Sequence, residues 1–97
     1  MRELTKKDKP ALLEVIQYFE KAFGFPCDRL SAYIWLQNYE PVEILNCLEI
    51  TVDWRDRKTA KKQEVTNNDV ERYATSVMRN RARSRKAVAE ILGDGAL

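Results

Sequence analysis

The stretch RYATSVMRNRARSRK, residues 72–86, begins with the apolar spacing of a buried helix and continues as a ladder of basic side chains. Its first half carries Tyr73, Ala74 and Val77 at helical spacing, which predicts contact with a core. The fifteen residues include six arginines or lysines and no carboxylate. By contrast, the stretch 30–54 carries four carboxylates and no basic residue. The function of the chain has to use this separation of charge.

The basic residues of this stretch form two rows on the predicted helix. One row, at spacings of three, four and seven residues, consists of Arg72, Arg79, Arg83 and Lys86, and a parallel row consists of Arg81 and Arg85. Guanidinium groups arranged in rows can follow the phosphates of a nucleic acid. The alternative is a solvated helix face, but such a face normally mixes both charge signs. Binding of nucleic acid, or of another polyanion, is therefore the favoured interpretation, and the wider region 55–86, with eleven basic and four acidic residues, supports it.

Proline, glycine and aspartate mark the limits of the helices that precede this stretch. Pro10 suits the first turn of a helix, where its missing amide hydrogen is no loss, and Gly24 can end that helix. Asp28 can cap a second, short helix that ends near Asn38. Pro41 begins a third helix, which can continue for a solvated turn or two beyond residue 55.

Asn68, followed three residues later by Glu71, resembles a capping box and predicts the start of the fourth helix. The apolar residues of the four segments supply the predicted core: Leu12, Val15, Ile16, Phe19 and Phe23; Leu30, Tyr33, Ile34 and Trp35; Val42, Ile44, Leu45, Cys47, Leu48 and Val52; Val70, Tyr73, Ala74 and Val77. The acidic Glu43 and Glu49 are expected on the outer side of the third helix. Beyond Val77 the same face continues into arginines, so we expect the fourth helix to leave the core there.

These patterns predict an all-α fold, a compact irregular bundle of about four helices with a long, basic C-terminal helix. The 97 residues suffice for one domain and not for two. Residues 1–9 are expected to be a flexible charged arm, residues 10–92 a single helical domain, and residues 93–97 a disordered tail. No apolar run is long enough to span a bilayer, and the first ten residues do not resemble a signal peptide, so we expect a cytoplasmic protein without membrane contact.

The residue types needed for catalysis or cofactor binding are scarce. The chain has no histidine, and its three glycines occupy predicted helix ends rather than a phosphate-binding loop. Glu49, Asp53 and Asp56 could hold a magnesium ion, but a solvated acidic face is the favoured interpretation. Cys27 and Cys47 have no metal-binding spacing and are expected to be reduced and structural. We therefore expect a non-enzymatic protein with no catalytic residue, metal or cofactor.

Two aromatic side chains leave alternatives open. Tyr73 could stack on a nucleic-acid base, although packing in the core is the favoured role. Trp54, immediately before a basic run, could be a surface anchor for a partner, although packing in the core is the favoured role. Ile91 and Leu92 form a small apolar patch beyond the arginines that could contact another helix or another subunit. The opposed acidic and basic regions also permit self-association into a homo-oligomer.

The segment YFEKAFG, residues 18–24, is followed by Pro26, Trp35, Tyr39, Pro41 and Ile44. This pattern resembles the DnaD-type C-terminal domain of bacterial and phage replication proteins, over residues 13–86. That family ends its domain with a Tyr-x-x-x-Ile-x-x-x-Trp helix that leads into a DNA-binding tail. Here Tyr73, Val77 and Arg81 occupy the three positions, so two agree in character and the tryptophan is replaced by an arginine.

The resemblance implies a DnaD-like domain acting in replication initiation as a non-enzymatic DNA-binding module of a primosome. Its partners would be single- or double-stranded DNA, bound with little sequence specificity, and the replicative helicase or its loader, which it would help to recruit. The residues predicted to bind DNA are Arg72, Tyr73, Arg79, Arg81, Arg83, Arg85 and Lys86. The alternative is a protein-interaction adaptor, or a phage-encoded regulator, that binds a replication protein through Trp54, Ile91 and Leu92.

Overall fold

The computed structural model describes residues 3–93, and within that range the chain is helical without a strand. The elements are a 3-10 turn η1 (Lys6–Asp8) and the helices α1 (Lys9–Phe23), α2 (Arg29–Asn38), α3 (Pro41–Ala60) and α4 (Asn67–Leu92). The predicted all-α bundle of four helices with a long C-terminal helix is confirmed. Residues 94–97, most of the predicted tail, lie outside the described residues.

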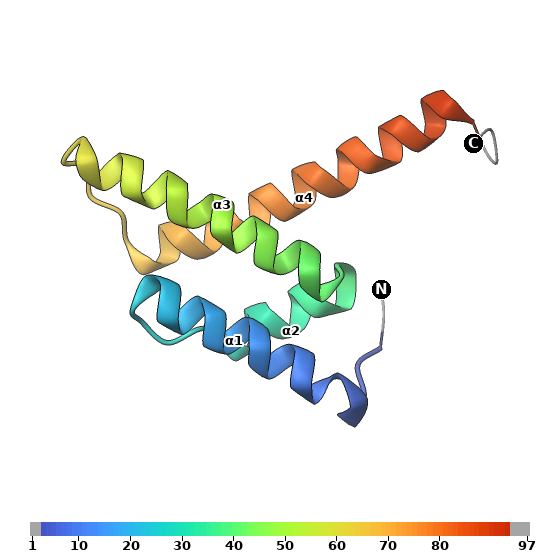
Figure 1. Cartoon of the computed structure of the whole chain (residues 1–97), viewed down its shortest axis with the longest axis horizontal. Coiled ribbons are helices and arrows are strands. Elements are labelled where there is room, and N and C mark those ends of the chain that lie inside the picture. Colours follow the sequence, from blue (N-terminus) through green and yellow to red (C-terminus); the bar gives the residue numbers. More distant parts are fainter. Residues whose placement is uncertain (1–2, 94–97) are drawn as a thin grey trace.

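Helix α3 is the centre of the bundle, because it packs against α1 on one side and crosses α4 on the other. Helix α2 packs against α1 and, more narrowly, against α3. The second half of α4 extends away from the other helices toward the C-terminus, as Figure 1 shows. The molecule is accordingly long and flat, measuring 47 × 36 × 16 Å along its principal axes.

Local sequence accounts for most helix ends. Pro10 lies in the first turn of α1, and Gly24 ends that helix with a left-handed φ of 76°, a conformation that costs glycine little. The carboxylate of Asp28 accepts a hydrogen bond from the backbone N–H of Ser31 and caps α2. Pro41 lies in the first turn of α3. The predictions for these four positions are confirmed.

The predicted capping box at the start of α4 was wrong by two residues. Thr66 is the N-cap, its hydroxyl accepting from the backbone N–H of Asp69 at 3.1 Å. The carboxylate of Asp69 in turn accepts from the backbone N–H of Thr66 at 3.0 Å. Asn68 and Glu71 have the same spacing, but Asn68 is already the second residue of the helix, so it is not the N-cap.

The N-terminal segment has more structure than its charge pattern indicated. Thr5 and Asp8 form a second capping box around η1. Leu4 is partly buried and packs against the core. Helix α1 follows η1 directly, beginning at Lys9.

The core is aromatic at its centre. Phe19 is fully buried, with its ring centroid 4.7 Å from that of Phe23, 5.1 Å from that of Phe25 and 6.1 Å from that of Trp35. The Trp35 indole N–H donates to the hydroxyl of Thr75 at 3.0 Å, which ties α2 to α4. The buried apolar residues are Val15, Ile16, Phe19, Phe23, Cys27, Ala32, Trp35, Leu36, Ile44, Cys47, Leu48, Val70, Ala74 and Met78.

The predicted inner face of α2 was largely wrong. Trp35 is buried as expected, but the buried residues beside it are Ala32 and Leu36. The side chains expected inside are instead exposed: Leu30 (64%), Ile34 (46%) and Tyr33 (37%). Because α2 is apolar nearly all round, the docking of Trp35 against Phe19, and not the periodicity, decides which side faces the core.

In α3, Ile44, Cys47 and Leu48 are buried as predicted, whereas Val42 is 67% exposed. Thr51 is fully buried, and its hydroxyl donates to the carbonyl of Cys47 at 2.8 Å, so its polar atom is satisfied within the helix. Val52 and Leu45 are only half-buried at the edge of the core. Both cysteines are buried and unpaired.

Candidate nucleic-acid interface

Helix α4 changes its environment halfway along its length. Val70, Ala74 and Met78 are buried, while Tyr73 and Val77 are half-buried at the side of the contact. From Arg79 to the end of the helix every residue is exposed except Ala82, which is half-buried. The expectation that the helix leaves the core after Val77 is confirmed, with Met78 as its last buried contact.

One basic row lies on the side of α4 that faces away from the core. At about 100° per residue, this row is nearly opposite the buried Val70 and Ala74. We call it the outer row; it consists of Arg72, Arg79, Arg83 and Lys86, all exposed. Within residues 3–93 none of the four forms a salt bridge. The outer row extends over about 21 Å of helix at a rise of about 1.5 Å per residue.

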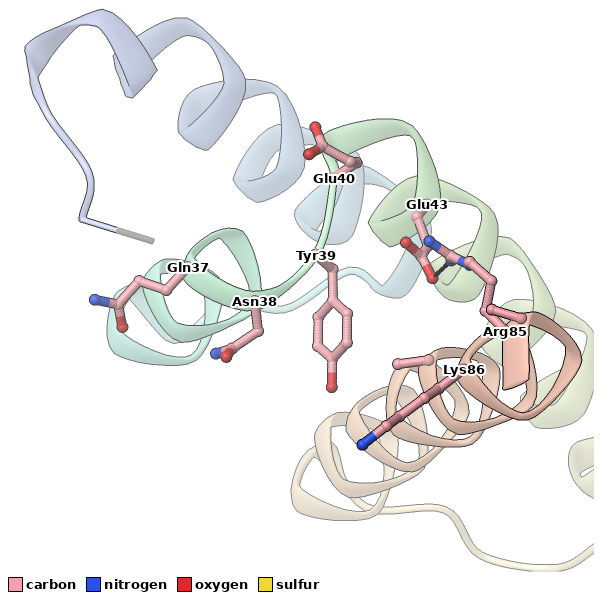
Figure 2. Close-up of a pocket in the computed structure, with 9 residues that line it drawn as sticks. Gln37, Asn38, Tyr39, Glu40, Glu43, Arg85 and Lys86 are labelled. Atoms are coloured by element: carbon pink, nitrogen blue, oxygen red, sulfur yellow. Dashed lines mark hydrogen bonds and ion pairs between the residues drawn. The ribbon is translucent and has the colours of Figure 1, made fainter. Parts of the chain in front are cut away.

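The second row, Arg81 and Arg85, lies on the side that continues the buried face. Arg85 forms an ion pair with Glu43 in the first turn of α3, 42 residues away in sequence (Figure 2). Glu43 is only 8% exposed, so its predicted position on the outer side of α3 was wrong. The pairing explains the burial, because the guanidinium of Arg85 compensates the charge that Glu43 brings to the interface. Arg85 therefore has a structural partner already.

A groove of about 490 Å³ adjoins this ion pair. It lies between the connection of α2 with α3 and the projecting half of α4. Its lining includes Tyr39, Glu43, Ala82, Arg85 and Lys86. Figure 2 shows Tyr39 and Lys86 extending into the space between the two segments.

Trp54 and Tyr73 stack on each other across the α3–α4 contact. Their ring centroids are 4.2 Å apart and the planes are only 8° from parallel. Both side chains are half-buried, so neither lies fully in the core and neither is fully exposed to a partner. This pairing was not predicted, because the two residues are 19 positions apart on helices whose crossing was not predicted.

The aromatic pair lines a second groove, of about 530 Å³, whose other residues come from α3, α4 and the loop between them. The groove-lining residues are Trp54, Lys58, Gln63, Glu64, Val65, Asp69, Arg72, Tyr73 and Ser76. A third, more polar groove of about 350 Å³ lies next to it, between α2 and α4, and is lined by Ser31, Asn68, Glu71, Arg72, Thr75, Ser76 and Arg79. Arg72 and Ser76 belong to both grooves, which are therefore adjacent.

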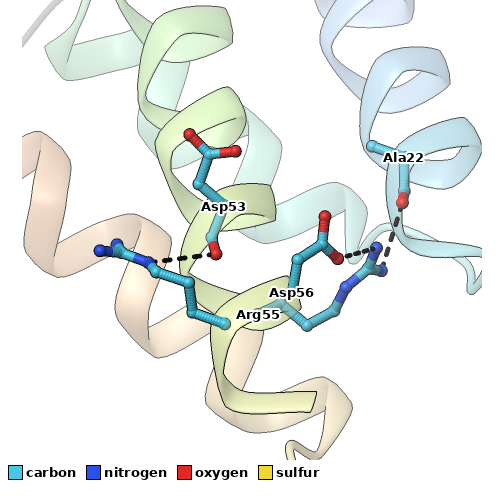
Figure 3. A network of polar contacts seen from close by, with 5 residues as sticks. Ala22, Asp53, Arg55 and Asp56 are labelled. Atoms are coloured by element: carbon cyan, nitrogen blue, oxygen red, sulfur yellow. Dashed lines mark hydrogen bonds and ion pairs between the residues drawn. The ribbon is translucent and has the colours of Figure 1, made fainter. Parts of the chain in front are cut away.

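Arg55, in the basic run that follows Trp54, is a structural residue. Its guanidinium donates to the carbonyl of Ala22 at 3.2 Å and to the carboxylate of Asp56 at 3.3 Å (Figure 3). It also lies over the ring of Phe23, 5.1 Å from the centroid. A cation at the last carbonyls of α1 stabilises that helix end. We expected the basic residues of this run to be exposed, and for Arg55, which is half-buried, this was wrong.

Four groups have pKa values shifted by their surroundings, and one of them is Tyr18, whose pKa is raised by burial and by the nearby carboxylates of Glu49 and Asp53. Burial raises the pKa of the Cys27 thiol to about 12, helped by the nearby carboxylates of Glu71 and Glu20. Burial also raises the pKa of Cys47. The hydrogen bonds from Thr66 lower the pKa of Asp69. None of these shifts produces a reactive nucleophile, since both thiols are held in their neutral form at neutral pH.

The end of α4 presents apolar side chains to solvent. Ile91 is 84% exposed, Val88 54% and Leu92 44%. Two of these, Ile91 and Leu92, are the predicted partner anchors, and they lie in the last turn of α4, whereas Trp54 lies in α3 and stacks on Tyr73 in the first half of α4. The three predicted partner residues therefore do not form one surface.

Acidic residues do not gather into a metal site in the described part of the chain. Among residues 3–93 no group of three or more histidine, cysteine, aspartate or glutamate side chains is arranged to hold a metal ion. Asp56 is paired with Arg55 instead. None of the helices in the same range is long and apolar enough to cross a bilayer.

The fold and its surface define a class: a small all-α domain from which one long helix carries a row of basic side chains into solvent. Compared with known protein families, curated proteins and solved structures, the chain shows no match.

Proposed function

We propose that this protein is a non-enzymatic DNA-binding module and that the outer row of α4 is its contact with the phosphate backbone. The observation that carries the proposal is the exposed outer row, Arg72, Arg79, Arg83 and Lys86, on the side of α4 that faces away from the core. A solvated helix with no binding role is stabilised by side chains of opposite charge three or four residues apart. This one instead concentrates like charges, which repel one another unless a polyanion is present.

The proposed contacts are electrostatic and independent of base sequence. Each phosphate that a cation neutralises releases counterions and adds about 0.9 to the slope of log K against log salt on duplex DNA, and about 0.7 on a single strand. Four contacts from the outer row therefore correspond to a slope of about 3. Arg85, in the second row, contributes less to DNA binding, because it would have to leave Glu43 to bind a phosphate.

The experiment is fluorescence anisotropy with labelled DNA over a series of salt concentrations. The variant Arg79→Ala/Arg83→Ala should lower the slope by about 1.5 to 2. The control variant Lys6→Ala/Lys7→Ala removes the same charge from exposed positions in η1 and should leave the slope unchanged. An equal loss in both variants would mean that net charge alone attracts DNA, and the proposal would be wrong.

The resemblance of residues 13–86 to the DnaD-type domain supports a particular setting for this activity. In that setting the module acts in a primosome and helps to recruit or load the replicative helicase. Tyr73 and Val77 face the α3–α4 contact, and Arg81, at the position of the family's tryptophan, is exposed in the second row. A pull-down of the replicative helicase or its loader by the full chain tests the setting separately from DNA binding.

A second candidate function, a protein-interaction adaptor, is favoured by the exposed apolar side chains Val88, Ile91 and Leu92 at the tip of α4. A DNA titration distinguishes the two functions, because an adaptor binds DNA only weakly while light scattering reports its stoichiometric complex with a replication protein. Ile91→Ser would abolish such a complex and leave the salt slope of DNA binding unchanged.

A further inference from the structure

The groove beside the Trp54–Tyr73 stack combines the features that a nucleobase requires. The two stacked rings cover one face of each other and leave an outer face for a base to stack on, and both residues are half-buried rather than closed off. The groove volume of about 530 Å³ falls in the range of small-molecule sites. Aromatic side chains bind unpaired bases by stacking, with little preference among the four bases.

The polar residues of this groove include both basic side chains, which suit a phosphate, and hydrogen-bonding side chains, which suit the edge of a base. Lys58 and Arg72 can neutralise a phosphate, while Gln63 and Glu64 can hydrogen-bond the edge of a base. Asp69, which also lines the groove, is already engaged in the capping box with Thr66 and is fixed in place. A phosphate is therefore attracted to Lys58 and Arg72, and the base is left to the aromatic pair.

Arg72 also connects this groove to the outer row. Arg72 and Ser76 line both the aromatic groove and the neighbouring polar groove, which contains Arg79. Along α4, Arg72 and Arg79 are about 10 Å apart at a rise of about 1.5 Å per residue. A strand with its phosphates on Arg72 and Arg79 thus passes directly by the Trp54–Tyr73 pair.

We propose that the groove formed by Trp54, Tyr73, Lys58 and Arg72 binds an unstacked nucleobase of a single strand whose phosphates follow the outer row. The inference rests on the proposed DNA binding and extends it. A duplex keeps its bases paired and stacked, so its bases do not reach the groove and it contacts the outer row alone. The module therefore binds single strands more tightly than duplex of equal charge at salt concentrations that weaken the phosphate contacts.

The test uses the intact protein and two single strands of equal length, oligothymidylate and its abasic counterpart, which has the same phosphates without bases. Oligothymidylate should bind about tenfold more tightly. It should also quench tryptophan fluorescence, whereas the abasic strand and a duplex should not. The quenched residue should be Trp54, because Trp35 is 2% exposed and hydrogen-bonded to Thr75.

Two variants locate the effect. Trp54→Phe keeps an aromatic ring, and it should retain tighter binding of oligothymidylate while losing the quenching. Trp54→Leu should reduce oligothymidylate to the affinity of the abasic strand and leave abasic binding unchanged. Circular dichroism establishes that both variants are folded, and the comparison of the two strands on the unmodified protein needs no variant.

The failure of this inference can be distinguished from that of the proposed function. If both strands bind the unmodified protein equally and neither quenches Trp54, the groove is not a base site, while phosphate binding by the outer row stands. If neither strand binds and the duplex does not bind either, both the groove and the outer row are excluded as nucleic-acid contacts.

Discussion

The ion pair between Arg85 and Glu43 predicts that one arginine of α4 matters for stability while its neighbours do not. Glu43 has a side chain 10% exposed, and Arg85 is its partner with a side chain 64% exposed. Removing one partner of a fully buried ion pair lowers the free energy of unfolding by about 3–5 kcal/mol, and an exposed ion pair contributes under about 1 kcal/mol to it. With one partner buried and the other largely in solvent, Arg85→Ala should lower the free energy of unfolding by about 1–2 kcal/mol.

Urea unfolding followed by circular dichroism measures this change directly. Arg83→Ala is the matched control, because Arg83 is exposed on the same helix and should change the stability by less than about 0.5 kcal/mol. Adding Glu43→Leu to Arg85→Ala should recover most of the loss, since no buried charge then remains without a partner.

The outcome also separates structure from DNA binding. Arg83→Ala should weaken DNA binding without affecting stability, and Arg85→Ala should mainly affect stability. If Arg85→Ala changes the free energy of unfolding as little as Arg83→Ala does, the ion pair with Glu43 does not hold α4 against α3. The explanation given for the burial of Glu43 is then wrong.

Three further predictions concern the scaffold. Thr66→Ala should destabilise the protein by about 1 kcal/mol in urea unfolding, because it removes the N-cap of α4; Thr66→Ser, which keeps the hydroxyl, should not. Cys27 should resist alkylation at neutral pH in the native protein, and stability should fall as the pH rises from 9 toward 12, since its pKa is raised to about 12 from 9.0 and the unfolded thiol ionises first; Cys27→Ser should show a flatter pH profile in thermal unfolding. Phe19→Ala should cost about 3–5 kcal/mol, whereas Leu13→Ala, at a side chain 42% exposed, should cost far less; equal losses in urea would contradict the assignment of Phe19 to the centre of the core.

Helix ends were predictable where a single residue type has a strong backbone preference. Pro10, Gly24, Asp28 and Pro41 each act through their own φ angle or a side chain that reaches amides two or three residues away. The start of α4 was missed because two overlapping sequences, one starting at Thr66 and one at Asn68, have the same capping spacing. Only the path of the preceding loop selects between them.

The face of a helix was predictable only where apolar and polar residues alternate clearly. In α1 the stripe that includes Val15 and Phe19 is buried as expected. In α2 the six apolar residues among ten are spread around the helix, so periodicity gives no direction, and Leu30 and Ile34 were assigned to the wrong side. Glu43 was misplaced for a different reason, because a carboxylate is expected in solvent unless a partner is known.

For the candidate interface, the sequence alone determined that α4 begins in the core and continues as two basic rows, because helical spacing fixes which side chains share a face. It also determined that the chain is all-α, through the helical periods and the positions of its prolines and glycines. Only the tertiary structure decided that Arg85 is held by Glu43, that Arg55 is held by Ala22 and Asp56, and that Trp54 meets Tyr73 beside Arg72. These contacts join residues many turns apart on different helices, and their existence depends on how α3 crosses its neighbours, which no local pattern specifies.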